Sequence, residues 1–504
     1  MSTGAKIAHN TAIQAIGKIL GLVLALLAAS LTLHYLKDDG NGVYTKVTAY
    51  LQMFGIGIDL GLYIILIKRL ATISFDTPER ESRVVNAIVT LRVVVGAIVL
   101  SSAPVIALII SQFNDNYTPQ IVIAIAATAG FYFFLSLNQL LSAIFQKFLY
   151  TAPVAIGEFL GKAVQLGGVL LVIALNGSVF WMLMTLVASS GANFLINLWF
   201  VRKFVRLRFV WDMPLFRDIA QEAWPIALSI VFTLIYFKGD TFIMTFFASD
   251  AIIGQYGAPY KILEVLVTFP AMFAGLVLPI LGAAWEAHDQ ARFQEIFQKS
   301  FTAIALIALP LIAGVQVLAP QIMTIIAGSD FATDPGGAER VVAVLRILIV
   351  ATGAIYFGTL FGYLVVSLNK QKTMLLGYAF VAASALAGYL IFIPRFSVYG
   401  AAAVTVYSET MVVLIGLTII LRTTRIRLSW YPIIGAAAAA CIMYAVLRLL
   451  LPLANAWSGL PELLNALVTT GVFAVIGASV FGVTILLFRV TTLSELRSLF
   501  LRNR

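Results

Sequence analysis

Runs of about 20 consecutive apolar residues recur from one end of this 504-residue chain to the other. Each run is long enough for a helix to cross the roughly 30 Å hydrocarbon core of a membrane. The chain is 61% hydrophobic and only 11% charged, whereas globular chains are about half apolar and about a quarter charged. No polar stretch is long enough to cover a soluble domain. The sequence therefore predicts an all-α polytopic membrane protein.

Charged residues, prolines, glycines and asparagines separate the apolar runs into fourteen predicted transmembrane helices. They cover residues 11–36, 43–67, 87–111, 119–143, 152–175, 179–201, 223–247, 253–281, 299–320, 339–367, 373–393, 399–421, 431–452 and 463–488.

The distribution of basic residues predicts the orientation. With a cytoplasmic N-terminus, the inner connections and the C-terminal tail hold 22 of the 33 Lys and Arg residues, and the outer connections hold four. Because basic loops stay on the cytoplasmic side, both termini are placed in the cytoplasm of a cell (inner or plasma) membrane. The net charge of +10 is therefore mainly a topology and lipid-headgroup signal, and no nucleic-acid partner is expected.

Residues that usually hold cofactors are scarce. The single cysteine, Cys441, lies in an apolar run, and the three histidines have no paired-ligand spacing. No metal, cofactor or catalytic residue is predicted. No loop is long enough for an ATPase or a glycosyltransferase domain, which favours a transporter over an enzyme.

A short repeat suggests that the chain is built from two halves. Gly42-Val43-Tyr44 opens the second predicted span and Gly254-Gln255-Tyr256 opens the eighth, an offset of 212 that also separates the starts of the first and seventh spans. Parallel repeats with a substrate path between them are a known transporter design. The predicted regions are an N-terminal lobe at 1–201, a cytoplasmic interfacial linker at 202–222, a C-terminal lobe at 223–421, two additional spans within 422–490 and a cytoplasmic amphipathic tail at 491–504.

Ionisable residues inside predicted spans are the candidate functional groups. Each costs at least about 2.5–3.5 kcal/mol near the membrane centre, so it needs a partner or a water-filled cavity. The cations are Lys18, Lys46, Arg92, Lys162, Lys238, Lys261 and Arg346, and the acids are Asp59, Glu158, Asp240, Glu264 and Glu409.

Some of these charges have a simpler interpretation. Glu158 with Lys162, and Lys261 with Glu264, have the spacing of ion pairs that only pack helices. Lys46 and Arg92 lie near span ends, where a long side chain can reach the headgroups. Counted over all twelve groups, seven cations face five acids, and this basic excess of two favours an anionic substrate, with phosphate or pyrophosphate as the obvious class.

Several stretches also carry a family pattern. KIAHNTAIQAIGKILGLVLALLAASLTLHYL at residues 6–36 is followed by GNGVYTKVTAYLQMFGIGIDLGL at 40–62. Asp240 lies in the seventh span ahead of the Gly-x-Tyr entry to the eighth, Pro279 lies near the end of the eighth, and YGAAAV at 399–404 opens the twelfth. Together they resemble bacterial Wzx-type oligosaccharide flippases, whose superfamily (MOP) also holds lipid II flippases and multidrug (MATE) exporters.

The resemblance implies two six-helix lobes around a V-shaped central cavity, with two extra C-terminal helices. It implies movement of a polyprenyl-(pyro)phosphate-linked oligosaccharide from the cytoplasmic to the outer leaflet. The partners would be this lipid-linked glycan, membrane lipids, and glycan assembly and polymerisation enzymes. As a hypothesis, Lys18, Arg92, Lys162, Lys238 and Arg346 contact the headgroup phosphates, and Asp59, Asp240 and Glu409 couple transport to an ion or proton.

Two other functions stay open at this stage. An ion-coupled multidrug exporter of the same fold would be expected to have an acidic cavity. A membrane glycosyltransferase or polymerase would be expected to carry catalytic groups in a substantial outer loop, and the outer acids Asp330, Asp334 and Glu462 lie in short loops.

Overall fold

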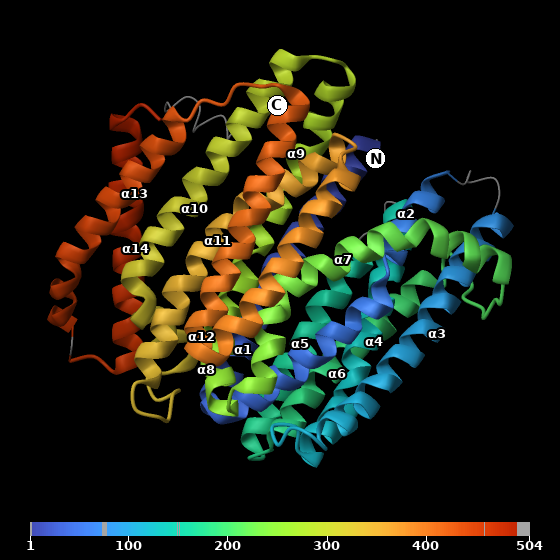
Figure 1. Ribbon diagram of the computed structural model, residues 1–504, viewed down its shortest axis with the longest axis horizontal. Helices are drawn as coiled ribbons and strands as arrows, with labels where there is room; N and C mark the ends of the chain where they lie inside the picture. Colours follow the sequence, from blue (N-terminus) through green and yellow to red (C-terminus); the bar gives the residue numbers. More distant parts are fainter. Residues whose placement is uncertain (1–2, 73–77, 149, 151, 458, 491–504) are drawn as a thin grey trace. The chain divides into compact units, whose positions relative to one another are not determined.

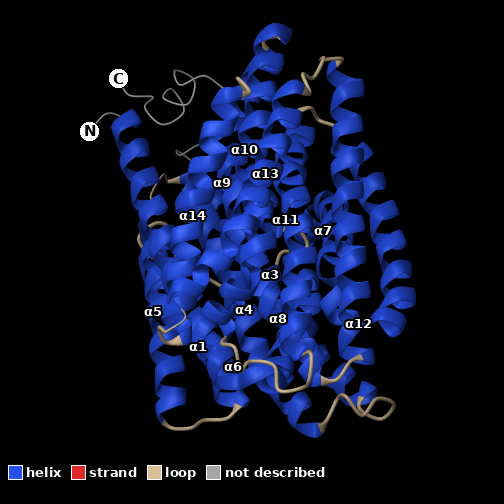
Figure 2. Cartoon of the chain, turned by 90° about the vertical axis from the view of Figure 1, so that its left-hand side faces the viewer, coloured by secondary structure: helices blue, strands red, loops and turns tan. Residues whose placement is uncertain are grey.

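The apolar runs fold into helices. The computed structural model describes residues 3–72, 78–148, 150, 152–457 and 459–490; their ordered elements are helices (Figure 1), and no strand occurs among these residues (Figure 2). Within this part of the chain, twelve helical stretches are long and apolar enough to cross a membrane. The predicted all-α polytopic membrane class is confirmed. The predicted amphipathic tail, 491–504, lies outside the described residues.

The chain divides into two compact units, Met1–Gly257 and Ala258–Arg504, with the division inside α8. The first unit contains α1 (Thr3–Asp59), α2 (Leu62–Thr72), α3 (Pro78–Ile110), α4 (Pro119–Lys147), α5 (Ala152–Ala174), α6 (Val179–Val201), α7 (Met213–Phe247) and the start of α8 (Asp250–Leu266). The second contains the rest of α8, α9 (Thr268–Glu286), α10 (Gln290–Ala327), α11 (Gly337–Ser367), α12 (Gln371–Thr424), α13 (Tyr431–Leu450), the short 3₁₀ helix η1 (Leu451–Trp457) and α14 (Glu462–Leu487). The lobe boundaries expected at 202–222 and 421 describe parts that would move against each other during transport. The two units are defined by packing, so these boundaries stay predictions.

The two longest helices are each two helices joined at one residue. α1 has 57 residues and a non-helical Lys37 with φ 55°, and α12 has 54 residues and a non-helical Ser397 with φ 51°. A straight helix of this length would span about 80 Å, far more than the roughly 30 Å membrane core. Positive φ is rare for a residue with a side chain, so each kink is a specific reversal point.

The two arms of α12 lie against each other. Tyr389 and Thr405 share a hydrogen bond of 3.3 Å, and the Tyr407 hydroxyl donates to Ser384 at 3.2 Å. Both pairs are placed nearly symmetrically about Ser397. α12 is therefore a helical hairpin, in which a single residue replaces the loop expected between the predicted spans 373–393 and 399–421.

The predicted span 253–281 is broken into α8 and α9, with the break at Val267. Pro270 explains the break, because proline has no N–H to donate to the carbonyl four residues earlier and its ring crowds that carbonyl. The carbonyl concerned belongs to Leu266, and it accepts a hydrogen bond of 3.1 Å from the Tyr356 hydroxyl of α11 instead.

The two extra C-terminal helices belong to the core of the second unit. α13 and α14 pack against each other and against α10 (Figure 1). Their shared apolar cluster includes Leu318 of α10, Met443 of α13 and Phe473 of α14. Small residues permit the close approach: a Cβ added at Gly477 would lie 2.8 Å from the Met443 methyl carbon.

Residues 205–212, which form neither helix nor strand, run beside α3 within the region of the predicted interfacial linker 202–222. Asn86 accepts from the Arg208 N–H at 2.9 Å and Thr90 accepts from the Val210 N–H at 3.0 Å, so polar side chains of α3 satisfy the backbone of this segment. α7 then begins at Met213, ten residues before the predicted span, because Asp212 caps its N-terminus and Pro214 occupies its first turn.

We expect Asp212→Asn to destabilise the protein slightly at neutral pH. The Arg83 guanidinium, which donates to this carboxylate at 2.8 Å, and the Leu215 N–H hold the pKa of Asp212 below its usual range. A lowered pKa contributes stability above the ordinary value, and that contribution disappears as the pH falls through the lowered pKa. Thermal unfolding of purified protein at several pH values should show a small wild-type advantage that is present at neutral pH and absent in strong acid. An advantage that grows on acidification would contradict this assignment.

Candidate functional site

Two glycines bring distant helices of the first unit into backbone contact. A Cβ added at Gly42 in α1 would overlap the Asp250 carbonyl of α8, and a Cβ added at Gly254 in α8 would overlap the Asp38 carbonyl of α1. The contact is reciprocal, and Asp38 and Asp250 are separated by the same 212 positions as the two glycines. The repeat is therefore Asp-x-x-x-Gly-x-Tyr, and its two copies pack against each other.

Buried polar side chains surround this contact. Asn41 donates to the Gly254 carbonyl at 2.9 Å, and Gln255 donates to the Asp38 carboxylate at 2.8 Å. Asp38, Asn41 and Gln255 are at most 1% exposed. Because unpaired polar groups are costly when buried, these bonds hold the two helices in one register.

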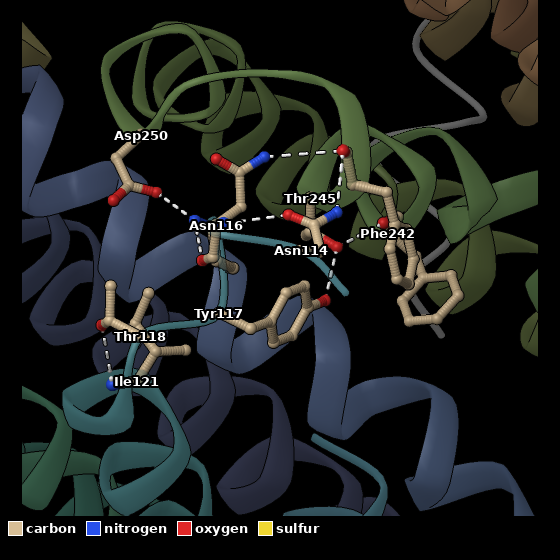
Figure 3. A network of polar contacts seen from close by, with 10 residues as sticks. Asn114, Asn116, Tyr117, Thr118, Ile121, Phe242, Thr245 and Asp250 are labelled. Atoms are coloured by element: carbon tan, nitrogen blue, oxygen red, sulfur yellow. Dashed lines mark hydrogen bonds and ion pairs between the residues drawn. The ribbon is translucent and has the colours of Figure 1, made fainter. Parts of the chain in front are cut away.

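A buried cation extends the network to the loop between α3 and α4, where Figure 3 shows the contacts. Lys46 of α1 forms an ion pair with Asp250 and donates to the Asn116 carbonyl at 2.9 Å. Asn114 of the same loop donates to the Phe246 carbonyl of α7 at 3.1 Å. Lys46 is 1% exposed, so its charge is balanced by Asp250 rather than by headgroups. We call Asp38, Asn41, Lys46, Asn116, Asp250 and Gln255 the polar junction.

Of the polar junction, the sequence singles out only Lys46 as a candidate functional group, and Gln255 only as part of the repeat. Asp38, Asn41 and Asn116 were assigned to outer connections, where polar residues need no explanation. The signal that marks the site is the Gly-x-Tyr repeat, extended backwards by four residues to Asp38 and Asp250.

Asp240 is fully buried next to this region, in α7. It accepts from the Tyr256 hydroxyl at 2.6 Å and from the Thr241 hydroxyl at 3.1 Å. Lys238, two residues earlier, is 6% exposed, and its ammonium lies 5.4 Å from the centre of the Phe237 ring. The structure thus brings two candidate residues into one buried segment, where the carboxylate holds α7 to the repeat tyrosine of α8.

Arg92 and Asp59 form an ion pair inside the first unit. The Arg92 guanidinium is 0% exposed and contacts the Asp59 carboxylate at 2.8 Å, while Asp59 is 27% exposed. Arg92 also donates to the Ile58 carbonyl at 2.8 Å, near the C-terminus of α1, where carbonyls lack a helical donor. A candidate phosphate contact and a candidate coupling acid therefore neutralise each other in this structure.

Apart from Lys18 of α1, the remaining candidates belong to other helices. In α5, Lys162 is half-buried and donates to Gln165 at 3.2 Å. Glu409 is buried in α12, and the predicted pair Lys261–Glu264 forms at 3.5 Å on the partly exposed face of α8. The side chain of Lys18 lies outside the described residues.

Arg346 lines a cavity in the second unit. Its Nε donates to the Gln316 carbonyl of α10 at 3.1 Å, and the Gln316 amide donates back to the Arg346 carbonyl at 2.7 Å. The cavity has a volume of about 650 Å³ and also contains Glu339 and Tyr399 in its lining.

The first unit has a cavity of a different character, about 880 Å³, beside the start of α7. Its lining is mainly apolar and includes Leu91, Trp211 and Phe216. Among the described residues that line it, Arg217 and Asp218 are the only charged ones. It suits an apolar chain rather than a polar headgroup.

The arrangement of helices matches solved transporters. The chain superimposes on a lipid II flippase, MurJ, in an inward closed conformation, with a TM-score of 0.69, 13% identity, and coverage of 92% of this chain and 98% of that one. An inward-facing multidrug resistance MATE transporter of the MOP superfamily gives a TM-score of 0.65 and 14% identity, with 80% and 95% coverage. A MOP superfamily transporter from Pyrococcus furiosus gives 0.57 and 14% identity, with 84% and 96% coverage. The fold is that of a multi-pass MOP transporter.

The family follows from the sequence comparison. Residues 5–285 match the model of the polysaccharide biosynthesis protein family, so the chain belongs to this family of membrane transporters. No curated protein sequence matches the chain. The expected resemblance and the expected transporter class are confirmed.

Proposed function

We propose that this protein moves a polyprenyl-(pyro)phosphate-linked oligosaccharide from the cytoplasmic to the outer leaflet, for surface polysaccharide synthesis. The observation that carries the proposal is the family match over residues 5–285, which links the chain to polysaccharide biosynthesis. In this proposal the kinked helices α1 and α12 each cross the membrane twice. That gives fourteen crossings, with both termini in the cytoplasm.

Basic side chains within membrane helices support a phosphate-bearing substrate. Lys162, Lys238 and Arg346 are the cations that the proposal assigns to the headgroup phosphates, because a phosphate is stabilised by Arg and Lys donors in a weakly hydrated site. Lys18 is assigned with them on sequence grounds. Arg92 is held by Asp59, so its contact with phosphate would require this pair to separate first.

Three acids within membrane helices are the candidates for coupling transport to a proton or an ion. Asp240 is the strongest candidate, because protonating it would weaken the hydrogen bonds that it accepts from Tyr256 and Thr241. Asp59 is partly exposed and Glu409 is buried in α12. Uptake of a proton or ion at these acids is proposed to alter helix contacts during transport.

The polar junction supports alternating access. It joins α1 to α7 and α8, which fall in different predicted lobes, and the predicted topology places it at the outer end. In the proposed cycle the outer side opens only when the Lys46–Asp250 pair and the Asp38–Gln255 bond separate. Polar contacts suit such a reversible closure, because water replaces their hydrogen bonds when they part.

Depleting the protein in its own cells tests the proposal. We expect a lipid-linked saccharide to accumulate in the cytoplasmic leaflet, measured by lipid extraction and mass spectrometry, while surface glycan falls. Wild-type protein and Lys372→Gln, which alters an exposed cation at the start of α12, should restore export. Lys162→Gln should reach the membrane in normal amount yet restore less than about a tenth of it, as expected for losing a charge-assisted phosphate contact.

Two results would reject the proposal. Depletion without any change in lipid-linked saccharide would do so directly. Drug resistance on expression, with unchanged glycan, would favour the multidrug exporter that the likeness to MATE structures also allows.

A further inference from the structure

A proline in α10 creates an anchor for an arginine. Pro320 has no N–H, so the Gln316 carbonyl four residues earlier lacks its helical donor. The Arg346 Nε–H donates to this carbonyl at 3.1 Å. Since one of the five guanidinium N–H groups is used in this way, the arginine is fixed in direction while its four terminal N–H groups stay available. Among the described residues, no hydrogen bond or ion pair to those terminal nitrogens is present.

Arg346 and Pro320 both line the 650 Å³ cavity of the second unit. The cavity lies between the C-terminal part of α10, the N-terminal part of α11 and Tyr399, and its size is within the range of small-molecule sites. The guanidinium offers the planar, bidentate geometry that matches a phosphate oxygen pair. The predicted topology places this end of α10 and α11 on the outer side.

The other end of the cavity has acceptor chemistry. Glu339 lines it in the first, exposed turn of α11, seven residues before Arg346, and therefore about 10.5 Å away along the same helix face. Tyr399, which is 44% exposed, presents an aromatic ring to the same cavity. A carboxylate accepts hydrogen bonds from sugar hydroxyls, and an aromatic face packs against the C–H face of a sugar ring.

We propose that this cavity binds the sugar-phosphate part of the lipid-linked glycan on the outer side, with the phosphate on Arg346 and the first sugar between Tyr399 and Glu339. The inference rests on the proposed function and assigns a place to its substrate after transfer. The order of groups matches a lipid in the outer leaflet, because the phosphate is deeper and the sugar is nearer to water. Glu339 at the entrance also repels a phosphate that carries no sugar, because such a ligand has no sugar hydroxyl to donate to the carboxylate.

Binding to the purified full-length protein, in a detergent without sugar or charge, tests this site. The probe is decyl glucosyl phosphate, a phosphodiester, and decyl phosphate and decyl glucoside each lack one half of it. We expect the phosphodiester to bind most tightly, and Arg346→Gln to weaken it by about tenfold or more. Glu339→Gln should weaken the phosphodiester and tighten decyl phosphate, because the carboxylate that repels an anion without a sugar is gone. Arg448→Gln, an exposed cation of α13, is the matched control and should bind as wild type.

Three results would overturn the inference. The first is equal binding by Arg346→Gln, provided that its thermal unfolding matches wild type. The second is equal affinity for decyl phosphate and the phosphodiester, which would indicate a general phosphate site. The third is displacement of the probe by phosphatidylethanolamine, with loss of that displacement in Glu339→Gln, which would assign the cavity to an ordinary zwitterionic phospholipid.

The outcome is separable from the proposed function. If depletion causes the lipid-linked saccharide to accumulate but Arg346→Gln binds and exports normally, this site is wrong and the flippase stands. If the probe binds through Arg346 and depletion changes no lipid-linked saccharide, the flippase is wrong and the site remains a glycosyl-phosphate site.

Discussion

Gly42→Ala is expected to open the polar junction and stop transport. The new methyl group would overlap the Asp250 carbonyl, which is backbone and cannot rotate aside. Overpacking of this kind costs typically 1–3 kcal/mol, and more against backbone, so we expect the ratio of closed to open protein to fall by about 100-fold. Gly254→Ala should act in the same way, because its methyl group would overlap the Asp38 carbonyl.

Cysteine labelling measures this opening. Cys441 is the only cysteine and is exposed, so it is first replaced by alanine. Thr45→Cys then introduces a thiol, on a side chain without the threonine methyl group, at a position that is 6% exposed beside the junction. In purified protein, a water-soluble maleimide should react with this thiol slowly in the parent and about 100-fold faster after Gly42→Ala, in step with the open population.

Gly167→Ala is the matched control. Gly167 is also a helical glycine of the first unit, but a Cβ added there meets nothing within 4 Å. Its labelling rate and export should equal those of the parent, with a slight gain in stability from the better helix former. Slow labelling of a folded Gly42→Ala protein that still exports glycan would show that this contact does not limit the cycle.

The sequence predicts the helices well because apolar length is a local property. It does not predict how α1 and α12 reverse. Charged and glycine-rich residues 37–42 look like a loop, yet Asp38 and Asn41 are helical because Gln255 and Gly254 of α8 satisfy their side chains. A single positive-φ residue, Lys37, provides the change of direction. Such a reversal depends on partners more than 200 positions away.

The sequence predicts the residues of the candidate site but not their partners. Arg92, Asp240 and Arg346 stand out in the sequence because a charge within a membrane helix is costly unless it has a partner or faces a cavity. Their partners are set by tertiary structure: Arg92 meets a carboxylate 33 positions away, and Arg346 meets a carbonyl that Pro320 leaves open. Proline is read in sequence as a flexible point, whereas here the carbonyls freed by Pro270 and Pro320 bind the side chains of Tyr356 and Arg346.

Arg92→Gln is expected to destabilise the first unit strongly. Removing one member of a buried ion pair typically costs about 3–5 kcal/mol. Here the Ile58 carbonyl and the Asp59 carboxylate would both lose their donor. We expect a loss of that size in reversible unfolding in mixed micelles, with a low yield of folded protein. Asp59→Asn should cost less, because Asp59 is 27% exposed and water reaches it.

Lys68→Gln separates this effect from a general loss of charge. Lys68 is 69% exposed and pairs with Glu222, and exposed pairs contribute about 0–1 kcal/mol, so its loss should barely change the free energy of unfolding.

The Arg92 variants also distinguish two roles for this residue. A structural clamp predicts that Arg92→Gln unfolds easily and that Arg92→Lys recovers only part of the stability. The Arg92 Nη1 binds both the Ile58 carbonyl and the Asp59 carboxylate, and a lysine ammonium cannot also replace the Nη2 contact with Gln139. A phosphate contact predicts the reverse: a fully stable Arg92→Gln protein that no longer exports the glycan, with export recovered by lysine.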